Sequence, residues 1–328
     1  MVLKFRMATV AAVLLMLASA TSAWAATPSK YLPDDSQMVL RIKVRELLDS
    51  DIVKKNALEQ IKTGLRENIQ LGLIFESLGF DPLRDIDVLT VSLGDFRMVA
   101  PMPGAVPESP FGNIFFLVEG KFDLDKVHTT LADAAKQMPD QISVSAYGGL
   151  KLYEAKQNDQ TMFVVFLDPN TAILGNKKEL VTNAVDVKQA KRKPNLNRTV
   201  VNMLTKVSDN DTVIMAMPLP KEAKEAARGN PQMALLVEAL EGFTGSVTAS
   251  KDLNIGLFIH TTEAQAAQQI RGQLEGLKLI AAGALQGQGV PGGEILAQMI
   301  QEAKTDANGK TISVKMTLTQ EMIDKAGR

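Results

Sequence analysis

The chain contains no cysteine among its 328 residues. Disulfides, thiolate nucleophiles, zinc–thiolate centres, iron–sulfur clusters and a lipid anchor on an N-terminal cysteine are therefore excluded. Small exported proteins often need disulfides because they bury too little apolar surface, whereas a chain of this length can be stabilised by core packing alone. We expect a fold that depends on packing.

Aromatic and imidazole side chains are scarce as well. Aromatic residues make up 5% of the chain, with one tryptophan, Trp24, and three tyrosines. This composition disfavours a stacking platform of the kind that binds carbohydrates. The two histidines, His128 and His260, lie in different parts of the sequence, and a zinc site draws on several ligands. We expect no metal and no cofactor.

Neither sign of charge dominates, since 36 lysines and arginines face 37 aspartates and glutamates. Nucleic-acid binding depends on many phosphate contacts from basic side chains, so we expect no nucleic-acid partner. A second long apolar run is also missing after the first residues, which predicts no transmembrane segment in the mature chain.

The first 25 residues have the pattern of an export signal. Lys4 and Arg6 precede an apolar run at 7–18, and Ala23-Trp24-Ala25 gives the small-x-small pattern that a signal peptidase reads. The run is shorter than the roughly 20 residues that span a bilayer. The sequence predicts cleavage after Ala25 and a mature protein in the periplasm or outside the cell.

The first part of the mature chain alternates between strand and helix periodicities. Four segments are predicted to be strands, at 38–44, 86–93, 113–121 and 142–147. Apolar residues at helical spacing fill 45–78 and 123–138, and Gly79 with Asp81-Pro82 ends the first of these helices. The resulting order, β-α-β-β-α-β, is that of a ferredoxin-like split unit.

A similar order recurs from residue 212 onward. The predicted elements are a strand at 212–217, a broken helix at 220–240, a hairpin at 246–250 and 254–261, helical segments at 263–285 and 295–303, and a strand at 311–319. Asn113-Ile114-Phe115-Phe116-Leu117-Val118 also resembles Asn254-Ile255-Gly256-Leu257-Phe258-Ile259, which favours a divergent internal duplication. Alternating α and β patterns also arise by chance, so that alternative stays open.

The predicted fold class is therefore α+β, with two divergent ferredoxin-like halves, mostly antiparallel strands and helices on one face. Between the halves, strands are expected at 151–155, 161–167 and 171–174, followed by a helix at 177–187. The basic stretch Lys188–Pro194 marks the boundary, giving a first half at 26–194 and a second at 195–328. Whether the halves form two sheets or one continuous sheet is left open.

Two segments resemble nucleotide-binding loops but fail on context. Gly287-Gln288-Gly289-Val290-Pro291-Gly292 follows a predicted helix where a dinucleotide fingerprint needs a strand. Gly309-Lys310-Thr311 precedes a strand where a phosphate loop needs a helix, so Asn308-Gly309 is better interpreted as a tight turn. A proline-rich stretch at 101–112 is interpreted as a surface loop, with a lid or partner loop as the alternative.

Acidic and sulfur side chains are further candidate ligands. Asp81, Asp85 and Asp87 cluster at one turn and Asp209 with Asp211 at another, without the spacing of a calcium loop, so capping and turn formation explain them better. Met215 and Met217 share a strand face and are interpreted as core residues rather than soft-metal ligands. The basic stretch is interpreted as a solvated connector, with contact to an anionic lipid or polymer as the alternative.

The Leu32-Pro33-Asp34-Asp35 opening before a strand and the Leu78-Gly79-Phe80-Asp81-Pro82 stop, together with the signal, resemble uncharacterised exported bacterial proteins with duplicated α/β segments. That group has no assigned activity. The resemblance therefore implies export and duplication but transfers no site residue to this chain.

Three functions remain open from the sequence. The first is a non-catalytic protein that binds another cell-envelope component through a sheet face or a groove between the halves. The second is a carrier that holds an apolar ligand between sheet and helices. The third is a carboxylate-dependent hydrolase, for which His128, His260 and Asp87 are the candidate residues. The absence of any recognisable catalytic motif favours a non-enzymatic role.

Overall fold

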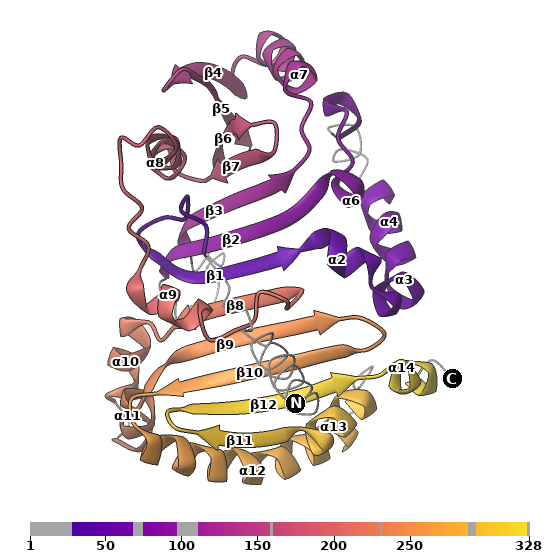
Figure 1. The fold of residues 1–328 in the computed structure, drawn as a ribbon, viewed down its shortest axis with the longest axis vertical. Coiled ribbons are helices and arrows are strands. Elements are labelled where there is room, and N and C mark those ends of the chain that lie inside the picture. Colours follow the sequence, from indigo (N-terminus) through magenta and orange to yellow (C-terminus); the bar gives the residue numbers. More distant parts are fainter. Residues whose placement is uncertain are drawn as a thin grey trace, which may run out of the picture.

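Twelve strands form one continuous antiparallel sheet, which is the main feature of the computed structural model (Figure 1). The structure describes residues 28–67, 75–96, 111–157, 160–229, 231–287 and 293–326. The strands are β1 (Ser36–Lys43), β2 (Ile86–Phe96), β3 (Phe111–Gly120), β4 (Ile142–Tyr147), β5 (Leu150–Gln157), β6 (Gln160–Asp168), β7 (Thr171–Gly175), β8 (Val213–Pro218), β9 (Leu240–Ala249), β10 (Leu253–Thr261), β11 (Lys304–Asn308) and β12 (Thr311–Leu318). Their order across the sheet is β11-β12-β10-β9-β8-β1-β2-β3-β7-β6-β5-β4.

The two parts of the chain meet at the pair β1 and β8, in the middle of the sheet. Val39 of β1 lies opposite Ala216, and Ile42 lies opposite Val213. Strands before residue 176 lie on one side of this pair, and strands after residue 212 lie on the other. The question of one sheet or two is thus answered in favour of a single sheet.

The strand pairings do not give ferredoxin-like halves. β1, β2 and β3 are consecutive neighbours, and the predicted fourth strand, β4, lies at the far edge with β5, β6 and β7 between. All paired strands are antiparallel, whereas a split β-α-β unit contains a parallel pair. The α+β class and the antiparallel sheet are confirmed, and the ferredoxin-like order within each half is not.

Helices cover both faces of the sheet, so the prediction of a single helical face is wrong. The helices are α2 (Val44–Asp49), α3 (Asp51–Asn56), α4 (Leu58–Glu67), α6 (Pro82–Asp85), α7 (Leu124–Gln137), α8 (Lys178–Lys188), α9 (Arg198–Leu204), α10 (Lys221–Ala227), α11 (Pro231–Glu238), α12 (Ala264–Gly287), α13 (Gly293–Glu302) and α14 (Gln320–Ala326). Val165 packs in the same core as α8, while its neighbour Phe166 makes an edge contact with His128 of α7. Adjacent strand residues point to opposite faces, so α7 and α8 lie on opposite sides.

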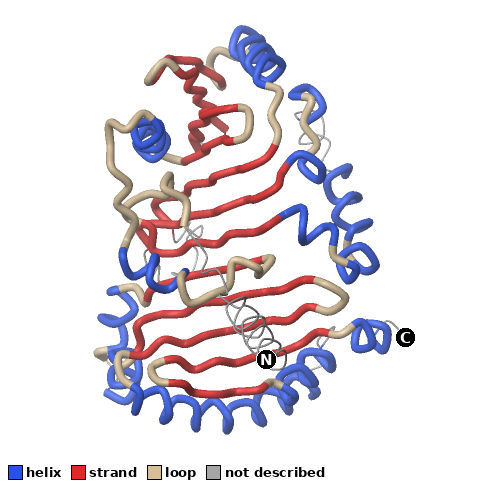
Figure 2. The backbone as a smooth tube through the Cα atoms, viewed as in Figure 1, coloured by secondary structure: helices blue, strands red, loops and turns tan. Residues whose placement is uncertain are grey.

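Two hydrophobic cores follow from this arrangement. The larger lies under α8 and α9 and includes side chains from both sides of the central pair, among them Val39, Ile173, Met203 and Ile214. The smaller lies on the other face, where Ala267 and Ile270 of α12 pack on Ile259 and Ile312. Figure 2 shows the long α12 following the lower rim of the sheet.

Most predicted elements are present, but one predicted helix is interrupted and three short elements were missed. The helix predicted at 45–78 is interrupted at Ser50, whose backbone is extended, and again at Ala57. Ser50 instead donates a side-chain hydrogen bond to the Leu47 carbonyl oxygen, which ends the first short helix. The elements α9, β11 and α14 were not predicted, because each is short and gives little periodic signal.

Some predictions lie outside the described residues. These are the export signal with its cleavage point after Ala25, residues 68–74 of the helix predicted at 45–78, the proline-rich stretch up to residue 110, and most of the segment Gly287–Gly292. Across the part of the chain that is described, none of the helices combines the length and apolarity needed to cross a bilayer.

The central pair should make the two sides of the sheet unfold together. Ile214 of β8 is 3% exposed, so Ile214→Ala should lower the free energy of unfolding by about 2–5 kcal/mol. The tyrosines, Tyr31, Tyr147 and Tyr153, all belong to the part of the chain before β8, so tyrosine fluorescence reports on the side of the sheet that does not carry the substitution.

We expect the denaturant midpoints from tyrosine fluorescence and from far-ultraviolet circular dichroism to fall by the same amount. Leu279→Ala is the control, because Leu279 is 75% exposed and its loss should change stability little. A tyrosine transition that stayed in place while the dichroism transition moved would show that the two sides unfold independently.

Candidate functional site

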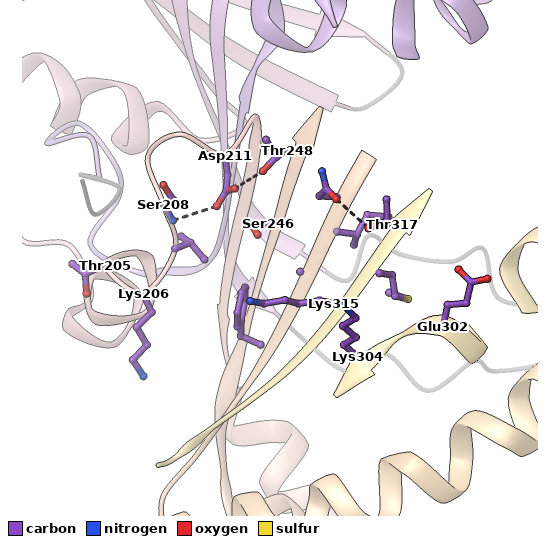
Figure 3. Close-up of a pocket in the computed structure, with 16 residues that line it drawn as sticks. Thr205, Lys206, Ser208, Asp211, Ser246, Thr248, Glu302, Lys304, Lys315 and Thr317 are labelled. Carbon is purple, nitrogen blue, oxygen red and sulfur yellow. Dashed lines mark hydrogen bonds between the residues drawn. The ribbon is translucent and has the colours of Figure 1, made fainter. Parts of the chain in front are cut away.

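A cavity lies on the face of the sheet that α9 covers (Figure 3). Its volume is about 710 Å³. The floor is formed by β9, β10 and β12, one wall by the loop from Thr205 to Asp211, and the far rim by Glu302 and Lys304. We call this space the sheet cavity.

Strand alternation explains why the floor is polar. Ser246, Gly256, Lys315 and Lys304 form one row across four neighbouring strands, and Thr248, Asn254 and Thr317 form the next row on the same face. The intervening residues point to the apolar face, because successive side chains of a strand alternate. The sequence therefore places polar groups on one face and the α12 core on the other.

Gly256 keeps the middle of the floor open. A Cβ atom at this position would lie 3.0 Å from both the Phe258 ring and the Ser246 hydroxyl oxygen. Lys315 extends across the floor at this point, with its amine directed over the neighbouring strand (Figure 3). The absence of a side chain at Gly256 thus leaves a path for this lysine.

Hydrogen bonds fix the polar groups at the upper end of the cavity. The Asp211 carboxylate accepts from the Ser208 backbone N–H at 3.2 Å and from the Thr248 hydroxyl at 2.7 Å. The Thr317 hydroxyl donates to the Asn254 side-chain oxygen at 3.0 Å. Asp211 is therefore committed to bracing the loop against β9, as the sequence interpretation of this turn predicted.

Three lysines give the cavity its charge. Lys304 and Lys315 lie directly opposite each other on β11 and β12, and Lys206 comes from the loop wall. Two carboxylates, Asp211 and Glu302, also line the cavity. With three amines against two carboxylates, the lining of the cavity has a formal net charge of +1.

A buried imidazole lies beside this cavity. His260 is 1% exposed, its Nε2 lies 2.9 Å from the Thr244 hydroxyl oxygen, and its Nδ1 lies 3.2 Å from the Thr311 hydroxyl oxygen and 3.3 Å from the Lys206 amine. Burial, and secondarily the positive charge of Lys206, lower the pKa of His260 to about 4. The ring is therefore neutral at pH 7 and accepts at Nδ1, so its role is to join β9, β10 and β12.

Known proteins resemble this chain only distantly. No family model matches the chain, and no curated protein matches it. A solved structure, crystal form III of TP0453, has a TM-score of 0.46 and 9% sequence identity, and the match covers 92% of this chain and 98% of TP0453. No property of TP0453 is transferred to this chain.

The other histidine belongs to a different region. His128 of α7 has its Nδ1 2.7 Å from the Tyr153 hydroxyl oxygen, and Phe166 contacts the ring edge-on. Burial raises the pKa of Tyr153 to about 12, so the phenol stays protonated and its O–H donates a hydrogen bond to the imidazole Nδ1. Burial and then Lys151 lower the pKa of His128. The pair stabilises the packing of α7.

The structure does not bring the hydrolase candidates together. Asp87 pairs with Arg45 at 2.6 Å on β2, His128 lies on α7, and His260 is buried between strands of the other side. The side chains within hydrogen-bond distance of the two imidazoles are Thr244, Thr311 and Lys206 for His260 and Tyr153 for His128, and none of these described partners is a carboxylate. These three residues share no motif in the sequence and no site in the folded chain.

The remaining acidic residues serve turns and ion pairs. Asp81 accepts from the Leu83 N–H at the start of α6, Asp85 accepts from the Asp81 N–H at 2.8 Å, and Asp209 pairs with Arg41 at 2.5 Å. Within the described ranges, no three His, Cys, Asp or Glu side chains gather as a metal site would require. The candidate soft ligands, Met215 and Met217, are half-buried on β8.

Two basic or glycine-rich segments have structural roles. Lys188 pairs with Asp168 at 3.2 Å and Arg192 pairs with Asp34, which ties the stretch Lys188–Pro194 to the first part of the chain. Gly309 adopts a φ of +55° in the turn between β11 and β12, as expected for a tight turn. Neither segment contributes a phosphate loop.

The sheet cavity could not be predicted from the sequence, for a physical reason. Its residues come from four strands and a loop, and Lys304 belongs to β11, whose five residues show no apolar alternation. The alternation of Ser246 and Thr248 with apolar neighbours was the one local signal, and it identified only a strand with a polar face.

His260 should make the fold sensitive to mild acid. Its folded-state pKa of about 4 lies below the ordinary value of 6.5, so the unfolded chain takes up a proton first as the pH falls through this interval. Stability should therefore fall between about pH 6.5 and pH 4, by roughly 3 kcal/mol from this group.

His260→Gln should remove most of that loss when the free energies of unfolding at pH 7 and pH 4 are compared by urea denaturation. His128→Gln is the matched control, and its effect should be smaller because that ring is only half-buried. Equal acid sensitivity of the wild type and His260→Gln would contradict the assignment.

Proposed function

We propose that this chain is an exported, non-catalytic binding protein whose sheet cavity holds an anionic group of another cell-envelope component. The observation that carries the proposal is the cross-strand pair of Lys304 and Lys315 beside an open polar space. The cavity's volume of about 710 Å³ falls within the range of small-molecule sites.

A cross-strand lysine pair costs stability unless an anion lies near it. Like charges directly opposite each other on neighbouring strands destabilise a sheet. A carboxylate, phosphate or sulfate between the two amines would remove this repulsion and gain charge-assisted hydrogen bonds. Lys206 on the loop wall adds a third donor, although its amine also contacts His260.

Binding is favoured over catalysis by the arrangement of the polar groups. The one imidazole beside the cavity is buried, and its ring nitrogens face Thr244, Thr311 and Lys206. A general base must reach the proton that it removes, and His260 is closed off by these partners. The remaining groups can hold and orient a ligand.

The double variant Lys304→Gln/Lys315→Gln should lose retention of the bound component. We would express the full chain, cross-link intact envelopes and quantify the co-purified material by mass spectrometry. Loss of two charge-assisted contacts should reduce retention by at least about tenfold, and high salt should weaken wild-type binding.

Lys310→Gln in the adjoining turn is the matched control, because it removes a lysine of the same hairpin without touching the cavity. Unchanged retention in the double variant, or equal loss in Lys310→Gln, would contradict the role of the lysine pair. If the wild type retained no envelope component, the proposed binding function itself would be contradicted.

A specific observation supports a second function, the carrying of an apolar ligand. On the opposite face, the central strands present Leu40, Val91, Met215, Val247 and Leu257, all of which are half-buried rather than buried. Such a surface suits an acyl chain or another apolar molecule. Mass spectrometry of gently extracted mature protein should then show a bound lipid, and protein that is free of lipid would contradict this second function.

We infer that the chain acts in the periplasm or outside the cell after cleavage at Ala25. The support is the pattern of Lys4, Arg6, the apolar run and Ala23-Trp24-Ala25. Fractionation and N-terminal sequencing should give a mature protein beginning at Ala26. A cytoplasmic protein with an intact N-terminus would contradict the export assignment.

We also infer that the two sides of the sheet arose by duplication. The cross-strand rows Val39-Ser92-Phe115 and Arg41-Thr90-Leu117 correspond to Ile214-Ser246-Gly256 and Ala216-Thr244-Phe258. The register matches the alignment expected from the repeated Asn-Ile segments of β3 and β10. A Thr-x-Ser sequence occupies the middle strand of both triplets, which adds support from residue identity.

A further inference from the structure

The two edges of the twelve-stranded sheet differ in a way that bears on binding. The edge strand β11 is five residues long, carries Lys304 and Asp306, and lies against α12 (Figure 1). Charged residues and a covering helix are common protections of an edge strand against pairing with another chain. The opposite edge strand, β4, has the sequence Ile-Ser-Val-Ser-Ala-Tyr, with no charge and no proline.

The register of β4 leaves a set of backbone groups facing outward. The Lys156 N–H donates to the Gln141 carbonyl oxygen, so Gln141 and Lys156 form a hydrogen-bonded pair. In an antiparallel ladder such pairs recur at every second residue, which directs the backbone of Ser143 and Ser145 toward β5. The N–H and C=O groups of Val144 and Ala146 therefore point to the free edge, as does the C=O of Ile142, whose N–H donates to the Met138 carbonyl oxygen at 2.9 Å.

A groove runs beside this edge. It has a volume of about 430 Å³ and lies between β4 and the C-terminal half of α7, with Ala132, Ala135, Pro139, Ile142 and Val144 among its lining residues. Val144 is 40% exposed. An added strand would thus find backbone partners on β4 and an apolar wall for every second side chain.

Charge distinguishes the possible occupants of the groove. Lys136 and Lys151 line it, and no carboxylate does so among the described residues. Lys136 pairs with Asp133, whereas Lys151 forms no ion pair with a described residue. A second copy of this chain, paired antiparallel through β4, would bring two more lysines to the same seam. A segment with an acidic residue would instead be attracted.

We propose that β4 and α7 form a peptide-binding site, in which an extended segment with alternating apolar residues and one acidic residue adds a thirteenth strand to the sheet. The backbone of the segment pairs with Val144 and Ala146 and donates to the Ile142 carbonyl oxygen. Its acidic side chain faces Lys151. This site lies at the opposite end of the sheet from the sheet cavity and does not depend on the function proposed for it.

The test uses the mature protein and a fluorescein-labelled nonapeptide of alternating valine and threonine with one central glutamate, followed by fluorescence anisotropy. Val144→Pro removes an outward N–H and should weaken binding about tenfold or more, while folding is retained because an edge position tolerates proline. Val144→Thr keeps the N–H and the β-branched shape and should bind as the wild type does. Circular dichroism checks that both variants are folded.

A second arm is independent of the protein's own stability. Two peptides would be compared, each N-methylated at one of the two alternating sets of residues. One of them should not bind, because its methyl groups replace the N–H donors that pair with β4. Replacement of the peptide's glutamate by glutamine, or Lys151→Gln in the protein, should each weaken binding about two- to fivefold, and the two changes together should weaken it no further.

Three results would overturn the proposal. The first is the absence of saturable binding by the wild type. The second is that Val144→Pro binds the peptide as tightly as the wild type does and that the wild type binds the N-methylated peptides as tightly as the unmodified one. The third is a stable dimer of the free protein in sedimentation that Val144→Pro converts to a monomer, because β4 would then be occupied by a second copy.

Discussion

The antiparallel pairing of β1 with β8 is the constraint on which the rest of this structure depends. It joins two strands that are far apart in sequence and makes one sheet from two parts of the chain. The larger hydrophobic core crosses this pair, since Val39 and Ile214 both pack against α9. Without the pair, α9 and the loop after it would lack one side of their support.

That loop links the central pair to the sheet cavity. Asp209 at its tip pairs with Arg41 of β1, and Asp211 two residues later accepts hydrogen bonds from Ser208 and from Thr248 of β9. One turn is therefore attached to both sides of the sheet. The wall of the sheet cavity is positioned by contacts that exist only because the two sides are continuous, which connects the stability of the centre to the geometry of the site.

Successive side chains of a strand point to opposite faces of the sheet, so the two faces differ in polarity. In the second part of the chain this alternation directs Ser246, Lys315 and Thr317 to one face and Ile259 and Ile312 to the other. The same alternation places the outward backbone of β4 next to an apolar groove at the far edge. The cavity and the edge groove are thus separate consequences of one continuous sheet, and neither requires a catalytic group.

Local pattern was enough to locate most of the individual elements. The strand expected at 142–147 is β4 with the same bounds, and the helix expected at 123–138 is α7 with a difference of one residue at each end, because the Asp123 side chain accepts from the Lys126 N–H and starts the helix. The α9 helix and β11 were missed because seven and five residues give too little periodicity. The pairing of the strands was predicted less well, because it is set by packing between segments that are distant in sequence.

The candidate site was predictable only in its outline. The absence of cysteine excludes disulfides and thiolate chemistry directly, because that conclusion depends only on which atoms the chain contains. Composition does not predict that Lys304 lies opposite Lys315, or that His260 is buried among Thr244, Thr311 and Lys206. The sequence by itself indicated the α+β class and excluded the chemistry that needs cysteine, and it contains the pattern from which we predict export. The tertiary structure alone decided the single sheet, its cavity and its free edge, because these arise from contacts between residues far apart in the chain.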